Sequence, residues 1–387
     1  MATQSKRLLS LDILRGITIA GMLLVNNPGS WGHIYAPLDH AEWIGLTPTD
    51  LVFPFFMFVM GVSMYFSLRK FNFQLSGHVF MKIARRTILL FLIGWAIFWF
   101  SFFMRHIFKP DCTLAEAVNC VDSLRILGVF PRLALTYFFG SMIAVTCKHK
   151  LVPWIIGGIL AVYAVILYFG DGYEWSTDNI IARIDTAVLG ENHMYHDTVG
   201  GLKLAFDPEG ILSTLPGIAH VLIGFMMGKT IIEHKDNFDR INRLLLVGFA
   251  MLLGGWLLSY GVPCGKKVWS TSFVLITCGL ASSVLALLIY VIDVQGHHKW
   301  CRFFHVFGVN PLFLYLCGSV LSVVFSTVPL GTGADGDVVT LRSGAYQLYS
   351  GIFGDETLGS CIYAVIFIFV NWCVGEILHR KNIIIKI

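Results

Sequence analysis

The first two long apolar runs of the chain are joined by residues 26–54, which read NNPGSWGHIYAPLDHAEWIGLTPTDLVFP. This stretch holds two histidines, two tryptophans, two adjacent asparagines and three acidic residues. A connection that only links two helices is usually shorter. This one is rich in groups that can carry protons, and it enters the next apolar run at Asp50. We predict that it forms the floor of an active site at a membrane face, with His40 as the first candidate. A well-packed loop with interfacial tryptophans is the alternative.

Composition predicts the fold class. Hydrophobic residues make up 56% of the 387 residues and charged residues only 13%, about half the share of a typical soluble domain. The sequence therefore predicts an all-α, polytopic membrane protein, and nothing in it supports nucleic-acid binding. We expect one transmembrane domain over residues 1–387, with about ten membrane-spanning helices near residues 11–27, 49–68, 87–104, 124–147, 151–169, 209–231, 243–261, 268–292, 303–325 and 359–378.

The distribution of positive charge predicts the orientation. If the N-terminus is cytoplasmic and the spans alternate, most of the 28 lysines and arginines fall in inner segments. Cytoplasmic loops carry such an excess, so both termini are predicted to be cytoplasmic. No A-x-A site follows the first apolar run, which we take as a retained span rather than a signal peptide. The three long segments, 28–48, 170–208 and 326–358, are then on the outer face.

Ionisable groups inside spans are costly and indicate function. Asp12 and Arg15 share one helical face, so they either pair with each other or contact a ligand. Arg15 and Asn26 lie eleven residues apart, about 16 Å along a helix. One span can therefore contact both ends of a long ligand. Asp50, at the start of the second span, is either a helix cap or a functional acid.

Two further spans carry charged or titratable groups. Arg125 and Arg132 share a face, which favours an anionic ligand or a buried acidic partner. His220 lies in the middle of the sixth apolar run. A lone histidine at such a place usually hydrogen-bonds a neighbouring helix, and we predict this for His220.

A basic ring on the inner face is either the ordinary positive-inside signal or a binding site for a phosphate-rich ligand. Neither a P-loop nor a dinucleotide-binding motif occurs in a suitable setting, and no metal-ligand spacing is evident, so no metal is expected. Cys112 and Cys120 lie in one predicted outer loop and form either a disulfide or two free thiols. The ring would comprise Arg7, Arg15, Arg85, Arg86, Lys229, Arg240, Arg243 and Arg302.

Seven blocks in one order resemble a known family, that of heparan-alpha-glucosaminide N-acetyltransferase and its bacterial relatives. These blocks are RLLSLDILRGITIAGMLLVNN, HAEWIGLTPTDLVFPFFMFVMGVS, ARRTILLFLIG, GVFPRLALTYF, DPEGILSTLPGIAHVLIGFMMGK, VPCGKKVWSTSFVLITCGL and FFHVFGVNPLFLY. The resemblance implies a multi-pass enzyme, here of a bacterial inner membrane, that moves acetyl from cytosolic acetyl-coenzyme A to the amine of a glucosamine-type sugar. From the resemblance we expect a protein without the large lumenal N-terminal domain of the animal enzyme.

The resemblance also implies roles for individual residues. His40 matches the family's active-site histidine, and Asn26 matches the asparagine near the acetyl group. Arg15, Arg85 or Arg86, and Arg132 match basic positions that we assign to the coenzyme's phosphates. The sequence departs from relatives at Pro131, often Gln, and at Pro311 after Asn310. These departures leave the acceptor and a homo-oligomeric state open.

The chemistry of these residue types agrees with such a reaction. A histidine titrates near working pH and can take a proton from an attacking amine. An asparagine amide can stabilise the thioester oxygen as it becomes negative, and Asp50 can orient His40. Direct attack and a covalent acetyl-His40 remain alternatives. A transporter without chemistry and an O-acetyltransferase of envelope glycans are the rival functions. Stabilisation by coenzyme A would separate the enzyme from the transporter.

Overall fold

The structure is a computed structural model that describes residues 8–109, 111–119, 121–333 and 336–385. Helices dominate it, as the sequence predicted. The long ones are α1 (Leu9–Val25), α2 (Val52–Leu68), α3 (Gly77–Ile107), α5 (Val129–Thr146), α6 (Val152–Phe169), α8 (Thr214–Glu233), α9 (Asn237–Leu258), α10 (Thr271–Leu288), α12 (Pro311–Thr327) and α14 (Glu356–Arg380). Shorter helices are α4 (Leu114–Val118), α7 (Ile180–Leu189), α11 (Cys301–Val309) and α13 (Leu341–Phe353).

Each of the ten predicted runs coincides with a helix or a helix pair. Among the described residues, eight helices are long and apolar enough to cross a membrane, and the pair α11–α12 makes a ninth if it is one span. The first predicted span, α1, has 17 residues and is about 25 Å long, somewhat short of the hydrocarbon thickness. The multi-pass, all-α architecture is thus confirmed with eight or nine candidate spans. The orientation of the termini stays a prediction.

The span predicted over residues 303–325 consists of two helices rather than one. The chain bends by 88° between α11 and α12, at Asn310 and Pro311. A proline has no N–H to donate to the preceding helical turn and is accommodated at the first position of a new helix. Pro311 therefore ends α11 and begins α12, and the sequence analysis overlooked this consequence.

Two small antiparallel hairpins were also not predicted. Strands β1 (His196–Val199) and β2 (Leu202–Ala205) pair in the second long connection, and β3 (Pro329–Thr332) pairs with β4 (Val338–Thr340) in the third. Both lie in segments predicted to be outer loops, and neither changes the helical architecture.

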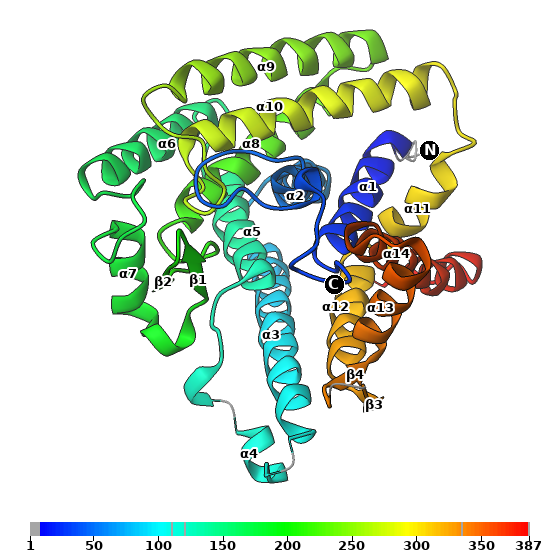
Figure 1. Cartoon of the computed structure of the whole chain (residues 1–387). Coiled ribbons are helices and arrows are strands. Elements are labelled where there is room, and N and C mark those ends of the chain that lie inside the picture. Colours follow the sequence, from blue (N-terminus) through cyan, green and yellow to red (C-terminus); the bar gives the residue numbers. More distant parts are fainter. Residues whose placement is uncertain (1–7, 110, 120, 334–335, 386–387) are drawn as a thin grey trace.

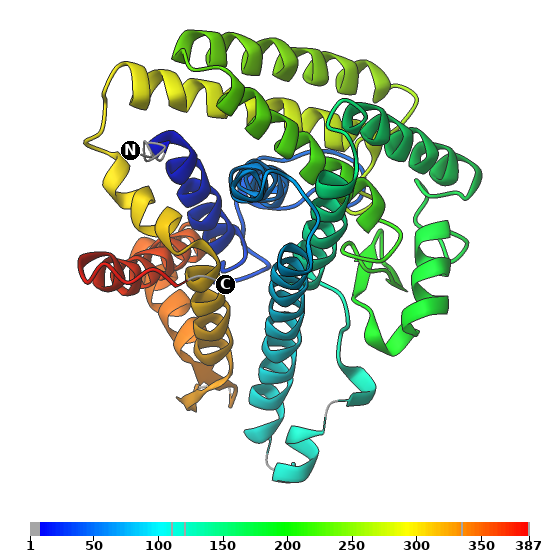
Figure 2. The ribbon, with the colours of Figure 1, turned by 180° about the vertical axis from the view of Figure 1, so that it is seen from behind.

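Helix α2 occupies the centre of the molecule. Figures 1 and 2 show it with α1 and the C-terminal helices on one side and α5 and α8 on the other. It packs closely on α8 at Gly61. A Cβ added there would lie 2.1 Å from the Val221 carbonyl oxygen, so only glycine fits. Small residues allow such close helix contacts in membranes. On α8, the His220 ring nitrogen lies 2.9 Å from the Pro54 carbonyl oxygen, which confirms its predicted structural role.

Candidate active site

The connection between α1 and α2 brings His40 and Asp50 together. It folds through two short 3-10 turns, Ala36–Leu38 and Thr49–Leu51, and the second places Asp50 at the N-terminal end of α2. The His40 Nδ1 atom lies 2.7 Å from the Asp50 Oδ1 atom. The Asp50 side chain is 1% exposed and that of His40 33%. A buried acid thus holds a ring that is partly exposed.

The second oxygen of Asp50 is fixed by three donors. Its Oδ2 atom accepts hydrogen bonds from the backbone N–H groups of Ala41 and Thr47, each at 3.1 Å, and from the Thr47 hydroxyl at 3.0 Å. All three donors favour the ionised carboxylate. Asp50 is therefore held in one orientation, and its interaction with His40 resembles the orienting acid of a catalytic base. Capping alone does not account for these contacts.

Lys266 completes this cluster, and the sequence analysis did not single it out. It lies in the loop between α9 and α10, and its Nζ atom is 3.1 Å from His40 Nδ1 and 3.4 Å from Nε2. The same atom is 3.6 Å from Asp50 Oδ1. Burial lowers the pKa of Lys266, whereas the nearby Asp50 carboxylate opposes this effect. The only sign of a role in the sequence was its place in the block VPCGKKVWSTSF. The charge distribution identified it only as a lysine of a predicted outer loop.

Asn26 lies at the C-terminal end of α1, near Tyr315 of α12. The hydrogen bonds of the described residues do not join it to His40. The Tyr315 ring packs on Phe130 of α5, with ring centroids 5.2 Å apart. Asn26 is exposed, and the structure places it near Tyr315 rather than in contact with His40.

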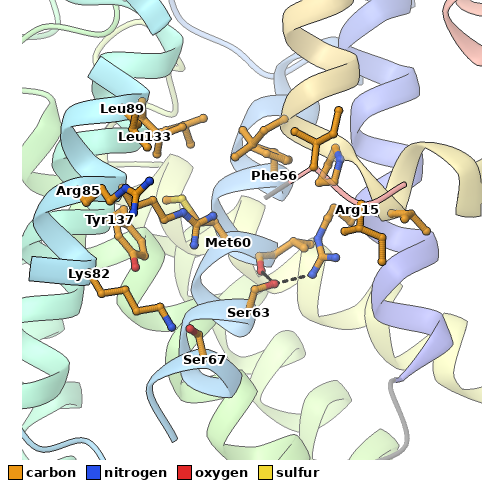
Figure 3. Close-up of a pocket in the computed structure, with 18 of the residues that line it drawn as sticks. Arg15, Phe56, Met60, Ser63, Ser67, Lys82, Arg85, Leu89, Leu133 and Tyr137 are labelled. Atoms are coloured by element: carbon orange, nitrogen blue, oxygen red, sulfur yellow. Dashed lines mark hydrogen bonds between the residues drawn. The ribbon is translucent and has the colours of Figure 1, made fainter. Parts of the chain in front are cut away.

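A basic pocket of about 890 Å³ lies toward the other end of α2 (Figure 3). Figure 3 shows Lys82 and Arg85 on α3 on one side, Arg15 on α1 on the other, and residues of α2 between them. Its polar wall contains five cationic side chains and two hydroxyls, contributed by Arg15, Lys70, Lys82, Arg85, Arg86, Ser63 and Ser67. Its deeper wall is apolar and includes Phe56, Val59, Met60, Leu89, Leu133 and Leu312. A cavity with one cationic and one apolar portion suits a ligand that is anionic at one end.

Three predicted basic residues meet in this pocket, namely Arg15, Arg85 and Arg86. Arg15 pairs with Asp12 at 2.9 Å and donates to the Ser63 hydroxyl at 2.7 Å, so it both forms the predicted ion pair and lines the pocket. The Arg86 guanidinium lies 4.6 Å from the centre of the Tyr137 ring. Its Nε atom is buried and hydrogen-bonds nothing in the described part of the chain.

Arg132 does not reach this pocket. Its side chain is fully buried, and it donates to the carbonyl oxygens of Pro208 and Ser213, both at 2.5 Å. Its guanidinium also lies 4.2 Å from the centre of the Trp269 ring. The neighbouring residues Leu133 and Tyr137 line the pocket instead. The structure thus separates Arg132 from the other predicted phosphate-binding residues.

Arg125 has the acidic partners that its position predicted. It contacts Asp207 through two nitrogens, at 2.9 and 2.6 Å, and Glu209 at 2.7 Å. These acids belong to the DPEG block. The residues that follow this block are held by Asp185, whose carboxylate accepts a hydrogen bond from the Ile211 N–H at 2.9 Å. Burial raises the pKa of Asp185 to about 7. This network fixes the loop that precedes α8.

Two other predictions concern a metal site and a disulfide. In the described ranges, no group of three or more histidine, cysteine, aspartate or glutamate side chains is arranged to hold a metal ion. Cys120 lies outside the described residues, so the bridge between Cys112 and Cys120 stays an expectation.

Fold and site together define a multi-pass helical membrane protein with a His–Asp–Lys cluster at one end of its central helix and a basic pocket toward the other. A family model described as "Heparan-alpha-glucosaminide N-acetyltransferase, catalytic" matches residues 7–112, which include His40 and Asp50. The chain is 28% identical over 378 residues to heparan-alpha-glucosaminide N-acetyltransferase of Homo sapiens and 27% identical over 389 residues to that of Mus musculus.

These alignments cover 82% and 84% of this chain, and 54% and 55% of the two relatives. The chain thus spans about half the length of the curated relatives it matches. The resemblance predicted from the sequence blocks is confirmed: the chain is similar to the heparan-alpha-glucosaminide N-acetyltransferases.

Proposed function

We propose that this protein is a transmembrane acetyltransferase that moves acetyl from acetyl-coenzyme A to the amine of a glucosamine-type sugar. The observation that carries the proposal is the placement of two different sites on one helix. Asp50, which holds His40, precedes α2, whereas Ser63 and Ser67 of α2 line the basic pocket. Asp50 and Ser67 are 17 residues apart, about 26 Å along a helix. A long donor molecule can bridge such a distance, with its nucleotide and its acetyl group in different environments.

The basic pocket suits the nucleotide end of the coenzyme. Its phosphates would lie against Arg15, Arg85 and Arg86, with Lys70 and Lys82 beside them. Arginine guanidinium groups bind phosphate oxygens through pairs of N–H donors. The buried Arg86 Nε atom, which has no hydrogen-bond partner among the described residues, provides one such donor.

The apolar part of the pocket would hold the arm of the coenzyme. Leu312 lines the pocket, and Tyr315 follows one turn later on the same helix. Tyr315 in turn interacts with Asn26. The thin, mostly neutral arm of the coenzyme would pass Leu312 and place its thioester near Asn26. The Asn26 amide would then stabilise the carbonyl oxygen as negative charge develops on it.

His40 would act as the base. In direct transfer, the acceptor nitrogen attacks the thioester carbonyl carbon, the new C–N bond forms and the C–S bond breaks. The proton of the amine goes to the accessible nitrogen of His40, and the coenzyme leaves as a thiolate that is then protonated. Asp50 stabilises the imidazolium that results. In the alternative route, His40 itself accepts the acetyl group first and then passes it to the amine.

The proposed topology follows from the positive-inside prediction. With a cytoplasmic N-terminus, the basic pocket opens toward the cytosol and His40 lies at the outer face. Donor and acceptor would therefore approach from opposite sides of the membrane, here proposed to be a bacterial inner membrane.

The test is transfer of labelled acetyl from acetyl-coenzyme A to glucosamine by the purified protein. We expect transfer by the wild type and a loss of about 10²- to 10⁴-fold in His40→Ala, since a positioned base contributes about this much. Thermal stabilisation by coenzyme A should persist in the variant. His33→Ala is the matched control, because His33 belongs to the same connection but contacts Tyr346, with Nδ1 3.0 Å from its hydroxyl.

The outcomes separate the alternatives. Coenzyme binding without transfer to any amino sugar would indicate a different acceptor, such as a glycan hydroxyl. Absence of both transfer and coenzyme stabilisation would contradict the proposal and favour a transporter. Label that stays on the protein after rapid denaturation near neutral pH without acceptor, and disappears in His40→Ala, would identify the acetyl-histidine route.

A further inference from the structure

Two arginines that do not belong to the basic pocket share one buried acid. Arg302, near the start of α11, contacts the Oε1 atom of Glu376 on α14, and the Nε atom of Arg380 donates to the same oxygen at 2.8 Å. The Glu376 side chain is 7% exposed, whereas those of Arg302 and Arg380 are 63% and 71% exposed. Within the described residues, neither guanidinium makes another hydrogen bond. One carboxylate thus positions two cations whose other N–H groups are open.

The exposed face of α14 leads to this pair. Exposed side chains recur along it at Ile366, Phe369, Cys373, Ile377 and Arg380, and a spacing of three or four residues marks one face of a helix. The first four are apolar, so in a multi-pass membrane protein this face contacts lipid tails. It extends over about 21 Å of helix. Arg380 therefore ends a lipid-facing stripe, at the level where headgroups begin.

Aromatic rings beside the arginines agree with this level in the membrane. Phe303, next to Arg302, stacks on Trp372 of α14 with ring centroids 5.9 Å apart, and Trp372 stacks on Phe369 at 5.6 Å. Trp300, two residues before Arg302, is exposed, and tryptophan is enriched at membrane–water interfaces. Figures 1 and 2 show α11 and the red C-terminal end of α14 at one edge of the molecule, where lipid can reach them.

The charge of these segments is positive. Residues 293–302 and 376–381 contain twice as many lysines and arginines as acids, and such an excess next to a membrane attracts anionic lipids. An ordinary exposed arginine of a basic segment is different, since Arg243 pairs with Asp239 on its own helix at 2.9 Å. The cations of the two segments are Lys299, Arg302, Arg380 and Lys381, and the acids are Asp293 and Glu376.

We propose that Arg302 and Arg380 bind the phosphate group of an anionic phospholipid, whose tails lie along the apolar stripe of α14. This inference does not depend on the proposed acetyl transfer. Guanidinium groups bind phosphate oxygens through pairs of N–H donors. Because both groups contact the same Glu376 oxygen, they lie close enough to bind one phosphate together. On the predicted topology, this lipid belongs to the cytoplasmic leaflet.

The test is a titration of the purified protein, in a neutral detergent, with phosphatidylglycerol. The rise in melting temperature reports binding. Phosphatidylcholine with the same tails is the zwitterionic comparison, and it should raise the melting temperature less. Arg302→Ala and Arg380→Ala should each need about fivefold more phosphatidylglycerol for half of the full rise, since one cation near an anionic lipid surface contributes about this factor. Their response to phosphatidylcholine should equal that of the wild type.

Arg243→Ala is the matched control. It removes an exposed arginine of α9 that is paired within its own helix, and it should respond to phosphatidylglycerol as the wild type does. Each alanine variant of the proposed site leaves Glu376 with one arginine, which limits the loss of stability. Arg302→Gln or Arg380→Gln takes the place of an alanine variant that does not fold.

Three results would overturn the proposal. The first is equal stabilisation by the two lipids, and the second is an unchanged response to phosphatidylglycerol in both arginine variants. The third is an equally large effect of glycerol phosphate, which has the headgroup without the tails and would indicate a site for a free phosphate. A weaker response in Arg243→Ala as well would show a general effect of positive charge and remove the assignment to Arg302 and Arg380.

Discussion

The two ends of α2 use positive charge in opposite ways. Toward the C-terminal end, five cationic side chains surround a cavity, and in the described part of the chain Arg85 and Arg86 form no ion pair with an acid. At the N-terminal end, cations lie against carboxylates, Lys266 on Asp50 and Arg125 on Asp207. Their charges are already neutralised by the protein itself.

This difference indicates separate tasks. Cations that face a cavity leave a positive potential for an anionic ligand. Cations that are held by buried acids fix geometry, and removing one of them leaves an uncompensated charge. Substitutions in the pocket should therefore change the affinity for the coenzyme, whereas substitutions in the paired cluster should change the rate or the stability.

The largest expected effect is a fall in the rate of acetyl transfer in the variant Asp50→Asn. The Asp50 Oδ2 position accepts three hydrogen bonds, so the asparagine oxygen should take this position and turn the NH₂ group toward His40 Nδ1. Nδ1 would then have to accept, and the imidazole proton would move to Nε2, where the base must be free. We expect kcat to fall by about 10²- to 10⁴-fold with coenzyme affinity retained.

The control for this change is Asp39→Asn. The Asp39 carboxylate accepts the His40 backbone N–H at 2.8 Å, and an asparagine oxygen can replace it. Its kcat should stay near that of the wild type. If Asp50→Asn retained the wild-type kcat, Asp50 would be a helix cap alone, and the paired end of α2 would have no catalytic role.

The next largest expected effect is a loss of stability in the variant Arg125→Ala. This change leaves Asp207, which is fully buried, and Glu209 without their cation. Breaking a buried ion pair typically costs about 3–5 kcal/mol. The melting temperature of the purified protein should fall clearly. Arg183→Ala, which removes an exposed arginine of α7, should leave it unchanged. Equal melting temperatures in the two variants would contradict the structural role of the paired charges.

The fold and the two ends of α2 could be predicted from the sequence to different extents. The apolar runs predicted the helices, because hydrocarbon thickness fixes the length of a span. The density of polar residues in one connection predicted His40 and Asp50, which are ten residues apart. The cavity between Arg15 and Arg85 could not be distinguished from the ordinary positive-inside signal, since both produce basic inner segments.

Other features depended on contacts that a single sequence does not specify. Lys266 comes to His40 only through the packing of two loops, and its sequence neighbour Lys267 looks the same but pairs with Asp197. Arg125 precedes α5, which begins at Val129, so it does not share a helix face with Arg132 as the spacing predicted. Both arginines nevertheless contact the loop before α8, and neither lines the pocket. The proline at position 311 indicates a bend locally, but the mean hydropathy of a long window does not register a single proline.

A smaller effect is expected at the pocket, from Arg85→Ala and Arg86→Ala. Each removes a cation that faces the cavity, and a charge-assisted hydrogen bond is worth about 1.5–3 kcal/mol. We expect the affinity for coenzyme A to fall about tenfold or more in each variant, with kcat at saturating coenzyme little changed. Calorimetric titration with coenzyme A measures this. Arg69→Ala is the control, because Arg69 follows α2 directly but does not line the pocket. Unchanged affinity in both variants would place the nucleotide site elsewhere.

The smallest effect concerns the uncharged wall of the same pocket. Ile384 and Ile385 line it, and the bend residue Asn310 holds this segment through two hydrogen bonds, to the Ile383 carbonyl oxygen at 2.9 Å and from the Ile385 N–H at 2.8 Å. Asn310→Ala removes both bonds without removing any charge. Each is worth about 0.5–1.5 kcal/mol, so the affinity for coenzyme A should fall about three- to tenfold.

Asn242→Ala, at an exposed position of α9, should have no such effect. The value of this comparison is that it separates shape from charge at the pocket end of α2. If Asn310→Ala weakened binding as much as Arg85→Ala, the position of the wall would contribute as much as the positive potential. The comparison between the two ends of α2 would then need revision. The pocket, with its unpaired cations, would depend on an anchored segment just as the cluster depends on paired charges.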